Sequence, residues 1–129
     1  MERKYATQME AARQGIVTPE LETVAKKEQM RVEELLPLVA QGKAVIPANR
    51  LHTCLDPEGV GSMLRTKINV NLGVSRDCKD YDVEMEKVRS AIHMGAEAIM
   101  DLSSHGNTQP FPRRLTAECP AMIGTVPVY

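Results

Sequence analysis

Polar and apolar side chains alternate strictly over residues 64–73, and this run is the clearest structural signal in the chain. The two faces of the predicted strand carry Leu64, Thr66, Ile68, Val70 and Leu72 on one side and Arg65, Lys67, Asn69 and Asn71 on the other. Strands of a parallel sheet are usually apolar on both faces. A strand with one continuous polar face therefore predicts that this face lines a ligand site, as on the inside of a barrel.

The pattern before this strand predicts short helices. Thr7 and Glu10 have the spacing of a capping box, and Gly15 stands where a C-terminal cap belongs. A second helix has Thr18 as its N-cap and a proline at its first position, and it runs to about Gln29.

A third helix is predicted from Val32 to about Gln41, and Pro37 should kink or shorten it. Residues 44–47 have the composition of a brief strand. Residues 56–61 are rich in turn-forming residues and are predicted to form a link.

The pattern after residue 73 alternates between helices and strands. Asp80, Asp82 and Glu84 crowd the start of a helix, as its dipole favours, and Gly95 ends it. The buried stripe of this helix is expected to consist of Met85, Val88, Ala91 and Ile92. The segments that follow are a strand at 96–102, a loop at 103–107, a helix at about 113–118 and a strand at 122–129. Two successive βαβ units imply parallel strands joined by right-handed crossovers.

These elements predict an α/β fold in which an N-terminal helical segment is followed by the first three β/α units of a parallel (β/α) barrel. Residues 1–61 form the helical region with a short strand, and residues 62–129 start the barrel catalytic domain. Three parallel strands leave an edge that must be covered or continued. Because a closed eight-stranded barrel needs roughly 250 residues, the chain is expected to be the truncated opening portion of a barrel enzyme.

Composition excludes several classes of function. The 16 basic and 17 acidic residues nearly cancel, which gives no support for a nucleic acid or an acidic membrane as partner. Cys54, Cys78 and Cys119 lie far apart, and neither Cys-x-x-Cys nor His-x-x-x-His occurs, so no metal ligands are predicted. This cysteine usage and the lack of an apolar run near ~18 residues predict a reduced, cytoplasmic protein.

Ligands of parallel barrels bind at the carboxyl ends of the strands. The residues that fall there are Asn69, Asn71, Met100, Asp101, the loop 103–105, Thr125, Val128 and Tyr129. Neutral hydrogen-bonding groups together with a methionine suit a neutral polar ring or a sugar better than a bare phosphate. The set contains no obvious nucleophile–base pair, so catalytic residues remain unknown.

Structural roles compete with each of these assignments. For Asn71 the pattern favours a role in the site over a structural role. Spacing alone instead predicts that Met100 is a core residue and that Tyr129 only packs against its neighbours. The histidines His52, His93 and His105 have the pattern of structural or solvated residues. The three cysteines are predicted to be small buried hydrophobic side chains.

Six strings in order resemble one family. They are residues 7–13 (TQMEAAR), 45–49 (VIPAN), 58–61 (EGVG), 67–73 (KINVNLG), 100–103 (MDLS) and 124–129 (GTVPVY). Together they are similar to the N-terminal portion of the ThiC family, the phosphomethylpyrimidine synthases of thiamine biosynthesis. The resemblance covers essentially all 129 residues but only roughly the first third of a family member.

The resemblance implies a radical S-adenosylmethionine carbon–carbon lyase that converts 5-aminoimidazole ribotide to hydroxymethylpyrimidine phosphate. It implies a [4Fe-4S] cluster, S-adenosylmethionine and a divalent metal (zinc) as cofactors of the full-length family, which forms homodimers. Carried over residue by residue, it places the substrate-contacting asparagine, methionine and tyrosine at Asn71, Met100 and Tyr129. These lie at predicted strand ends, where the barrel argument also places the site.

The chain also departs from the family pattern. The family's metal-binding histidines and its Cys-x-x-Cys-x-x-x-x-Cys cluster motif have no counterpart here, so these 129 residues alone are expected to be inactive and to bind no cofactor. Pro37 and Pro112 look out of place within the helices of the family pattern. The family string Met-Asp-Leu-Ser-Thr-Gly reads Met-Asp-Leu-Ser-Ser-His-Gly at residues 100–106.

This altered loop leaves open a paralogous function, the 5-hydroxybenzimidazole synthase of anaerobic cobamide (vitamin B12) biosynthesis, which acts on the same ribotide. An alternative of another class is an inactive truncated fragment or interaction module, whose open sheet edge would pair with another chain. A small self-contained α/β binding domain is the remaining alternative.

Overall fold

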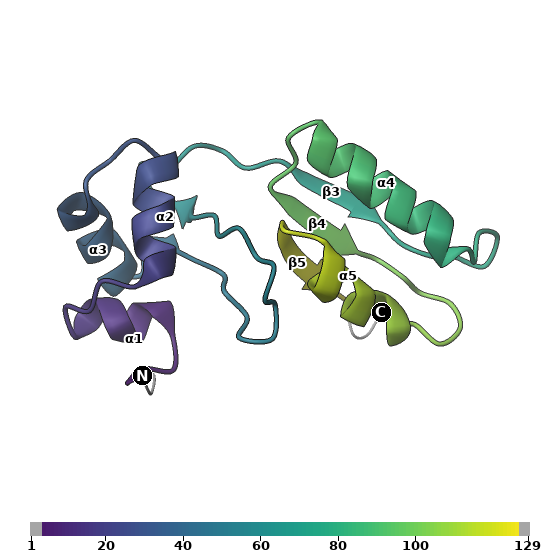
Figure 1. Ribbon diagram of the computed structural model, residues 1–129, viewed down its shortest axis with the longest axis horizontal. Helices are drawn as coiled ribbons and strands as arrows, with labels where there is room; N and C mark the ends of the chain where they lie inside the picture. Colours follow the sequence, from purple (N-terminus) through teal and green to yellow (C-terminus); the bar gives the residue numbers. More distant parts are fainter. Residues whose placement is uncertain (1–3, 127–129) are drawn as a thin grey trace. The chain divides into compact units, whose positions relative to one another are not determined.

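A computed structural model describes residues 4–126 of the chain (Figure 1). It forms two compact units, each with its own core. The first contains the residues up to 48 together with 57–66, and the second contains residues 49–56 together with those from 67 onward. No helix within the described part of the chain is long and apolar enough to span a membrane.

The first unit packs three short helices on a two-stranded ribbon. Its elements are α1 (Gln8–Arg13), α2 (Pro19–Lys27), α3 (Val32–Ala40), β1 (Ala44–Val45) and β2 (Val60–Gly61). The core that they share consists of Ala12, Leu21, Val24, Ala25, Leu35, Val39, Ala44 and Ile46. The three predicted helices are therefore confirmed, each within about one turn of its expected end.

Two predictions for this unit need correction. Residues 60–61 were expected in a link but form β2, antiparallel to β1, because Gly61 allows a close approach: a Cβ there would lie 2.3 Å from the Lys43 carbonyl oxygen. Pro37 was expected to kink or shorten the helix, but it does not shorten α3, which continues to Ala40. Proline removes one helical hydrogen bond, and the core contacts of Leu35 and Val39 hold the helix in place.

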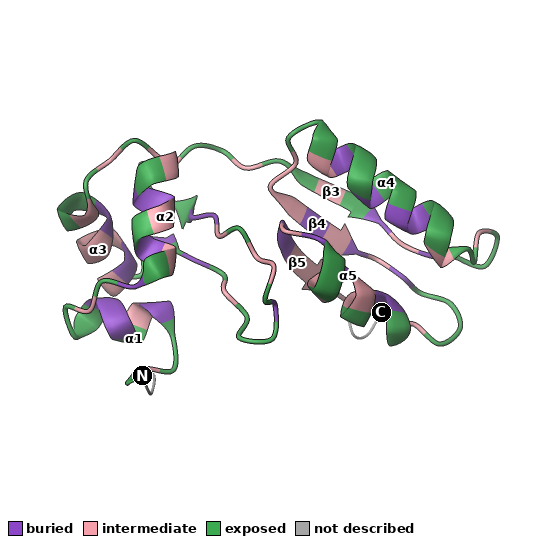
Figure 2. Cartoon of the chain, in the orientation of Figure 1, coloured by how far each residue is buried: buried purple, intermediate pink, exposed green. Residues whose placement is uncertain are grey.

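The second unit is a three-stranded parallel sheet with two helices. Its elements are β3 (Asn69–Leu72), α4 (Tyr81–His93), β4 (Ala98–Asp101), α5 (Pro110–Glu118) and β5 (Met122–Thr125), and the strand order is β3-β4-β5. One core joins both helices to the sheet and consists of Leu72, Met85, Val88, Ala91, Ile99, Phe111, Leu115, Cys119 and Ala121. Both helices therefore cover the same face of the sheet, and Figure 2 shows buried residues on both helices and on the strands. The predicted mixed α/β fold with parallel strands is confirmed.

The strands are shorter than the alternation predicts. The first begins at Asn69 rather than residue 64, because Leu64 packs against the core of the first unit. The second spans 98–101 rather than 96–102. The third is described as far as Thr125, and residues 127–129 lie outside the described part of the chain.

Helix α5 begins three residues earlier than predicted, at Pro110. Pro112, which seemed misplaced inside a helix, is the third helical residue. The first four N–H groups of a helix have no partner within it, so a proline there removes no helical hydrogen bond.

Candidate functional site

The side chains at the centre of the sheet meet in one row across the three strands. Asn71 of β3 is the register partner of Met100 in β4, which in turn is the partner of Gly124 in β5. Val70 and Leu72 belong to or pack against the core under the helices, whereas Asn71 is exposed. Because side chains alternate along a strand, Asn71 and Met100 lie on the face opposite α4 and α5.

Two contacts organise this row. The Asn69 side-chain Nδ2 donates a hydrogen bond of 2.8 Å to Oδ1 of Asn71, so the two amides form a pair along β3. Met100 lies across β5 at Gly124, where a Cβ would be 2.8 Å from its Cε and 2.9 Å from its Sδ. The result is an amide pair beside a thioether, which offers neutral hydrogen bonds and an adaptable apolar surface to a ligand.

The backbone after β3 is bound to the backbone after β4. The Leu102 N–H donates to the Leu72 carbonyl at 2.7 Å, and the Ser104 N–H donates to the Val74 carbonyl at 3.1 Å. The Val74 N–H donates to Oγ of the buried Ser103 at 3.0 Å. The carboxyl ends of these two strands therefore form one hydrogen-bonded layer.

Two buried carboxylates support this layer. Asp101 is 3% exposed, and its Oδ1 accepts from the Ser103 N–H at 2.9 Å. Glu84 of α4 is 0% exposed, and its Oε2 accepts from the Gly73 N–H at 2.9 Å. From the sequence, Glu84 was expected only to interact with the helix dipole at the start of α4. A signal was present, because residues 84, 88 and 91 share one helical stripe.

An aromatic pair lies beside the loop that follows β4. The rings of Tyr81 and Phe111 stack with centroids 5.1 Å apart, and the Tyr81 hydroxyl donates to the Asn107 carbonyl at 2.7 Å. Burial raises the pKa of Tyr81, and the nearby Asp101 carboxylate raises it further. Tyr81 therefore acts here as a neutral hydrogen-bond donor to the loop.

The remaining predicted site residues are dispersed. Thr125 is exposed at the end of β5, and Ser104 and His105 are exposed in the loop after β4. Tyr129 and Val128 lie outside the described residues. The structure thus brings Asn71 and Met100 together, while the predicted contribution of Tyr129 stays a prediction.

The other histidines and the cysteines have structural surroundings. His52 is buried, with its Nε2 2.6 Å from the Cys119 carbonyl oxygen, and His93 is exposed. Cys119 is buried, Cys54 and Cys78 are half-buried, and all three are free thiols. Among residues 4–126, no cluster of three or more potential metal ligands occurs.

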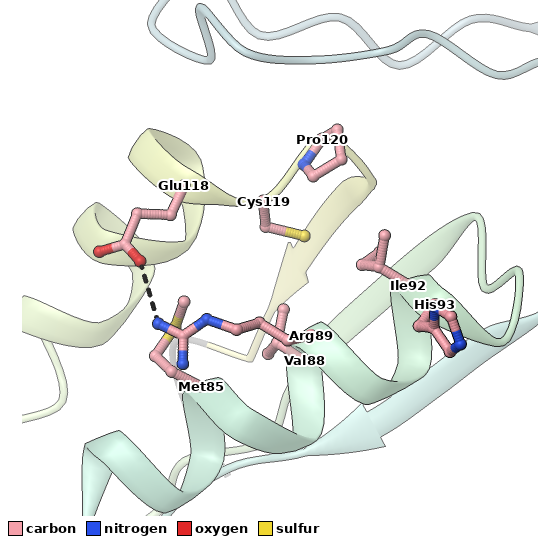
Figure 3. A pocket seen from close by; sticks show the side chains of 8 residues that line it. All are labelled: Met85, Val88, Arg89, Ile92, His93, Glu118, Cys119 and Pro120. Carbon is pink, nitrogen blue, oxygen red and sulfur yellow. Dashed lines mark ion pairs between the residues drawn. The ribbon is translucent and has the colours of Figure 1, made fainter.

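A cavity of about 350 Å³ lies between α4 and the end of α5 (Figure 3). Apolar side chains such as Met85, Val88 and Ile92 line it, together with Arg89 and Glu118, which form an ion pair of 3.6 Å. These residues come from the helices rather than from the exposed face of the sheet. Apolar walls and a cation already paired with a carboxylate make it a poor site for a phosphate-bearing ligand.

Comparisons with known proteins show the family to which the chain belongs. Residues 7–129 match the model of the Radical SAM ThiC family. The chain is 62% identical over 125 residues to a phosphomethylpyrimidine synthase of Clostridium botulinum and 61% identical over 126 residues to one of Alkaliphilus oremlandii. These alignments cover 97% and 98% of this chain but only 29% of each relative, so the chain spans less than a third of their length. The chain belongs to the Radical SAM ThiC family and corresponds to the N-terminal part of its phosphomethylpyrimidine synthases.

Proposed function

We propose that this chain forms the N-terminal part of a radical S-adenosylmethionine lyase that converts 5-aminoimidazole ribotide to hydroxymethylpyrimidine phosphate. The observation that carries the proposal is the 62% identity to a phosphomethylpyrimidine synthase over 97% of the chain. In this proposal the sheet β3-β4-β5 is the first part of a (β/α) barrel, and the exposed face that bears Asn71 and Met100 is its interior.

The residues of this face suit the proposed role in substrate binding. The amides of Asn69 and Asn71 offer donors and acceptors to the imidazole and ribose groups, and Met100 offers a thioether wall. Tyr129 would add a third contact after β5. None of these side chains is a strong acid or base, so they would bind and orient the ribotide rather than exchange protons with it.

The residues present do not fit the proposed [4Fe-4S] cluster. The cluster needs several nearby thiolates, whereas the described residues offer no metal-binding group and Cys119 is buried inside the core. We assign the ligands of the cluster, of S-adenosylmethionine and of the divalent metal to the part of the relatives that this chain does not span. Without that part, the 129 residues would not catalyse the reaction.

The loop after β4 favours one alternative product. Ser104 lies in the layer that joins the ends of β3 and β4, His105 follows it, and the side chains of both are exposed, so a bound ribotide can reach them. The alternative is 5-hydroxybenzimidazole synthesis from the same ribotide. An inactive interaction module is the remaining alternative, because β3 and β5 each have one edge without a strand partner among the described residues.

A chimera tests these functions directly. The corresponding N-terminal segment of the Clostridium botulinum phosphomethylpyrimidine synthase would be replaced by this chain, and the purified protein would receive ribotide, S-adenosylmethionine and a reductant without oxygen. Formation of hydroxymethylpyrimidine phosphate supports the proposal, and formation of 5-hydroxybenzimidazole supports the alternative. A folded, cluster-loaded chimera that makes neither product would overturn both enzymatic assignments.

Two matched variants test the site within the active chimera. Met100→Ala and Asn71→Ala each remove a proposed substrate contact, and we expect kcat/KM to fall at least about tenfold, which corresponds to ~1.4 kcal/mol. Met94→Ala removes an exposed side chain at the C-terminal end of α4, outside the candidate site, and serves as the control. Equal losses in all three variants would show that the row has no special role.

A further inference from the structure

We propose that Glu84 is a positioning residue that fixes the carboxyl end of β3 and thereby the orientation of Asn71. Among the described residues it is the most deeply buried acidic side chain, at 0% exposure. A buried carboxylate is costly unless hydrogen bonds and opposite charges compensate it. Its retention inside a helix–sheet core therefore calls for a specific role.

The two carboxylate oxygens of Glu84 have different partners. Oε2 accepts from the backbone N–H of Gly73 at 2.9 Å, and Oε1 pairs with the Lys87 ammonium at 2.5 Å. Lys87 is one turn away on the same helix and half-exposed. The ion pair therefore compensates the charge locally, while the bond to Gly73 is the contact that reaches the sheet.

At Gly73 the backbone after β3 packs closely against the backbone after β4. It follows the last residue of β3 and comes two residues after Asn71. Its φ is +140°, and a Cβ there would lie 2.5 Å from the Ser103 nitrogen and 2.9 Å from the Leu102 carbonyl carbon. The chains after β3 and β4 thus pack backbone against backbone at this position.

A hydrogen bond from the Gly73 N–H to the Glu84 carboxylate consequently restrains several residues at the ends of β3 and β4. The layer formed by Val74, Leu102, Ser103 and Ser104 carries hydrogen bonds in both directions between the two strand ends. Glu84 ties this layer to α4 through a charge-assisted hydrogen bond, which is stronger and shorter than a neutral one. Asn71 and Met100, which precede the two strand ends, then keep a fixed spacing.

Three variants distinguish the contributions of the Glu84 side-chain length, the Glu84 charge and the ion pair with Lys87. Glu84→Gln keeps the length and an acceptor oxygen but loses the charge. Glu84→Asp keeps the charge but is one methylene shorter, so it withdraws from Gly73. Lys87→Met keeps the carboxylate and removes only the ion pair.

Amide hydrogen exchange of this chain, followed by NMR, measures the effect without any reaction. We expect Glu84→Asp to speed exchange at Gly73 and Val74 at least about tenfold and to shift the side-chain amide signals of Asn71. Glu84→Gln should give a smaller change, and Lys87→Met should stay within about twofold of the wild type. Unchanged Gly73 and Asn71 signals in Glu84→Asp, or equal effects of Glu84→Asp and Lys87→Met, would overturn the proposal.

The consequence for substrate rests on the proposed function and is measured in the chimera. We expect Glu84→Asp to raise the KM for the ribotide about tenfold while kcat changes by less than about threefold, with substantial recovery in Glu84→Gln. A purely structural role would instead destabilise both variants alike and leave KM unchanged. An inactive chimera with intact Glu84 would refute the proposed function, whereas the exchange experiment judges the positioning role independently.

Discussion

At the scale of single residues, a comparison of Gly73 with Gly95 distinguishes the cost of backbone strain from the cost of a steric clash when a glycine is replaced. Both have positive φ, +140° and +91°, but a Cβ at Gly95 meets nothing within 4 Å whereas one at Gly73 meets backbone atoms of the next strand end. We expect Gly95→Ala to lower the free energy of unfolding by about 1 kcal/mol through backbone strain alone. Gly73→Ala should cost about 3 kcal/mol or more, because backbone atoms must also move.

Urea denaturation of the two variants measures this difference. Circular dichroism should show a lower midpoint for Gly73→Ala than for Gly95→Ala, with similar slopes. Equal midpoints would mean that the backbone after β4 can move away from Gly73 without cost. In that case the layer between the two strand ends would be soft rather than fixed.

Cys119 predicts a dependence of stability on pH. Burial raises the pKa of its thiol above the ordinary 9.0, a bond with the Ala121 backbone opposes this shift, and Cys54 adds to it. The folded state therefore favours the protonated thiol. This contribution to stability is fully present below pH 9.0 and is lost as pH rises through the raised value.

Comparison with Cys119→Ala isolates this contribution. The difference in unfolding free energy between the wild type and Cys119→Ala should shrink as pH rises from about 8 to about 10.5. Thiol labelling by a disulfide reagent offers an independent measurement, since half-buried Cys54 and Cys78 should react before buried Cys119. A difference that stays constant with pH, together with rapid labelling of all three thiols, would contradict this prediction.

At the scale of elements, α2 differs from α1, α3 and α4 in the residue that ends it, and replacing this residue should stabilise the protein. The helices α1, α3 and α4 each end with a glycine of positive φ, at Gly15, Gly42 and Gly95. Helix α2 has the same bonds, with the Met30 N–H on the Ala25 carbonyl at 3.0 Å, but its left-handed residue is Gln29 at φ 55°. A side chain there is strained, because only glycine adopts this region freely.

We expect Gln29→Gly to raise the free energy of unfolding by about 0.5–1 kcal/mol, since Gln29 is exposed and its side chain contributes little packing. The reverse substitution, Gly15→Gln, is the matched control and should cost a similar amount because a Cβ there meets nothing within 4 Å. Thermal unfolding of both variants measures the pair. A loss of stability in Gln29→Gly would show that the side chain of Gln29 makes a compensating interaction.

The sequence predicted elements well where a local pattern determines them. The alternation around Val70, Asn71 and Leu72 placed the correct side chains on the correct faces, and the capping threonines Thr7 and Thr18 opened the expected helices. The alternation did not reveal where the strand begins, because Leu64 has the right period but packs in the other unit. Long-range packing, rather than local pattern, decides that boundary.

The same limit applies to the candidate site. Asn71 and Met100 were predicted from strand ends, and their register places them side by side. The role of Glu84 depends on Gly73, eleven residues earlier, so a charge near a helix start could not reveal it. Likewise β2 forms by pairing with β1, and two residues carry too short a pattern to predict.

At the scale of the whole molecule, the two units have separate hydrophobic cores with no residue in common. Leu35 lies at the centre of the first core and Leu115 in the second, and both are 0% exposed. Replacement of either by alanine should cost about 2–5 kcal/mol through lost burial and a residual cavity. Because each core is built from its own elements, we expect each substitution to weaken mainly its own unit.

Amide hydrogen exchange resolved by residue tests this independence. Leu35→Ala should speed exchange across α2 and α3 and leave β3, β4 and α5 near their wild-type rates, whereas Leu115→Ala should do the reverse. Val17→Ala changes a half-exposed side chain and should alter neither set of amides. If both leucine variants sped exchange uniformly along the chain, the units would unfold as one cooperative body. The two separate cores would then not unfold independently. A substitution at the strand ends of the sheet would also speed amide exchange in the helices of the first unit.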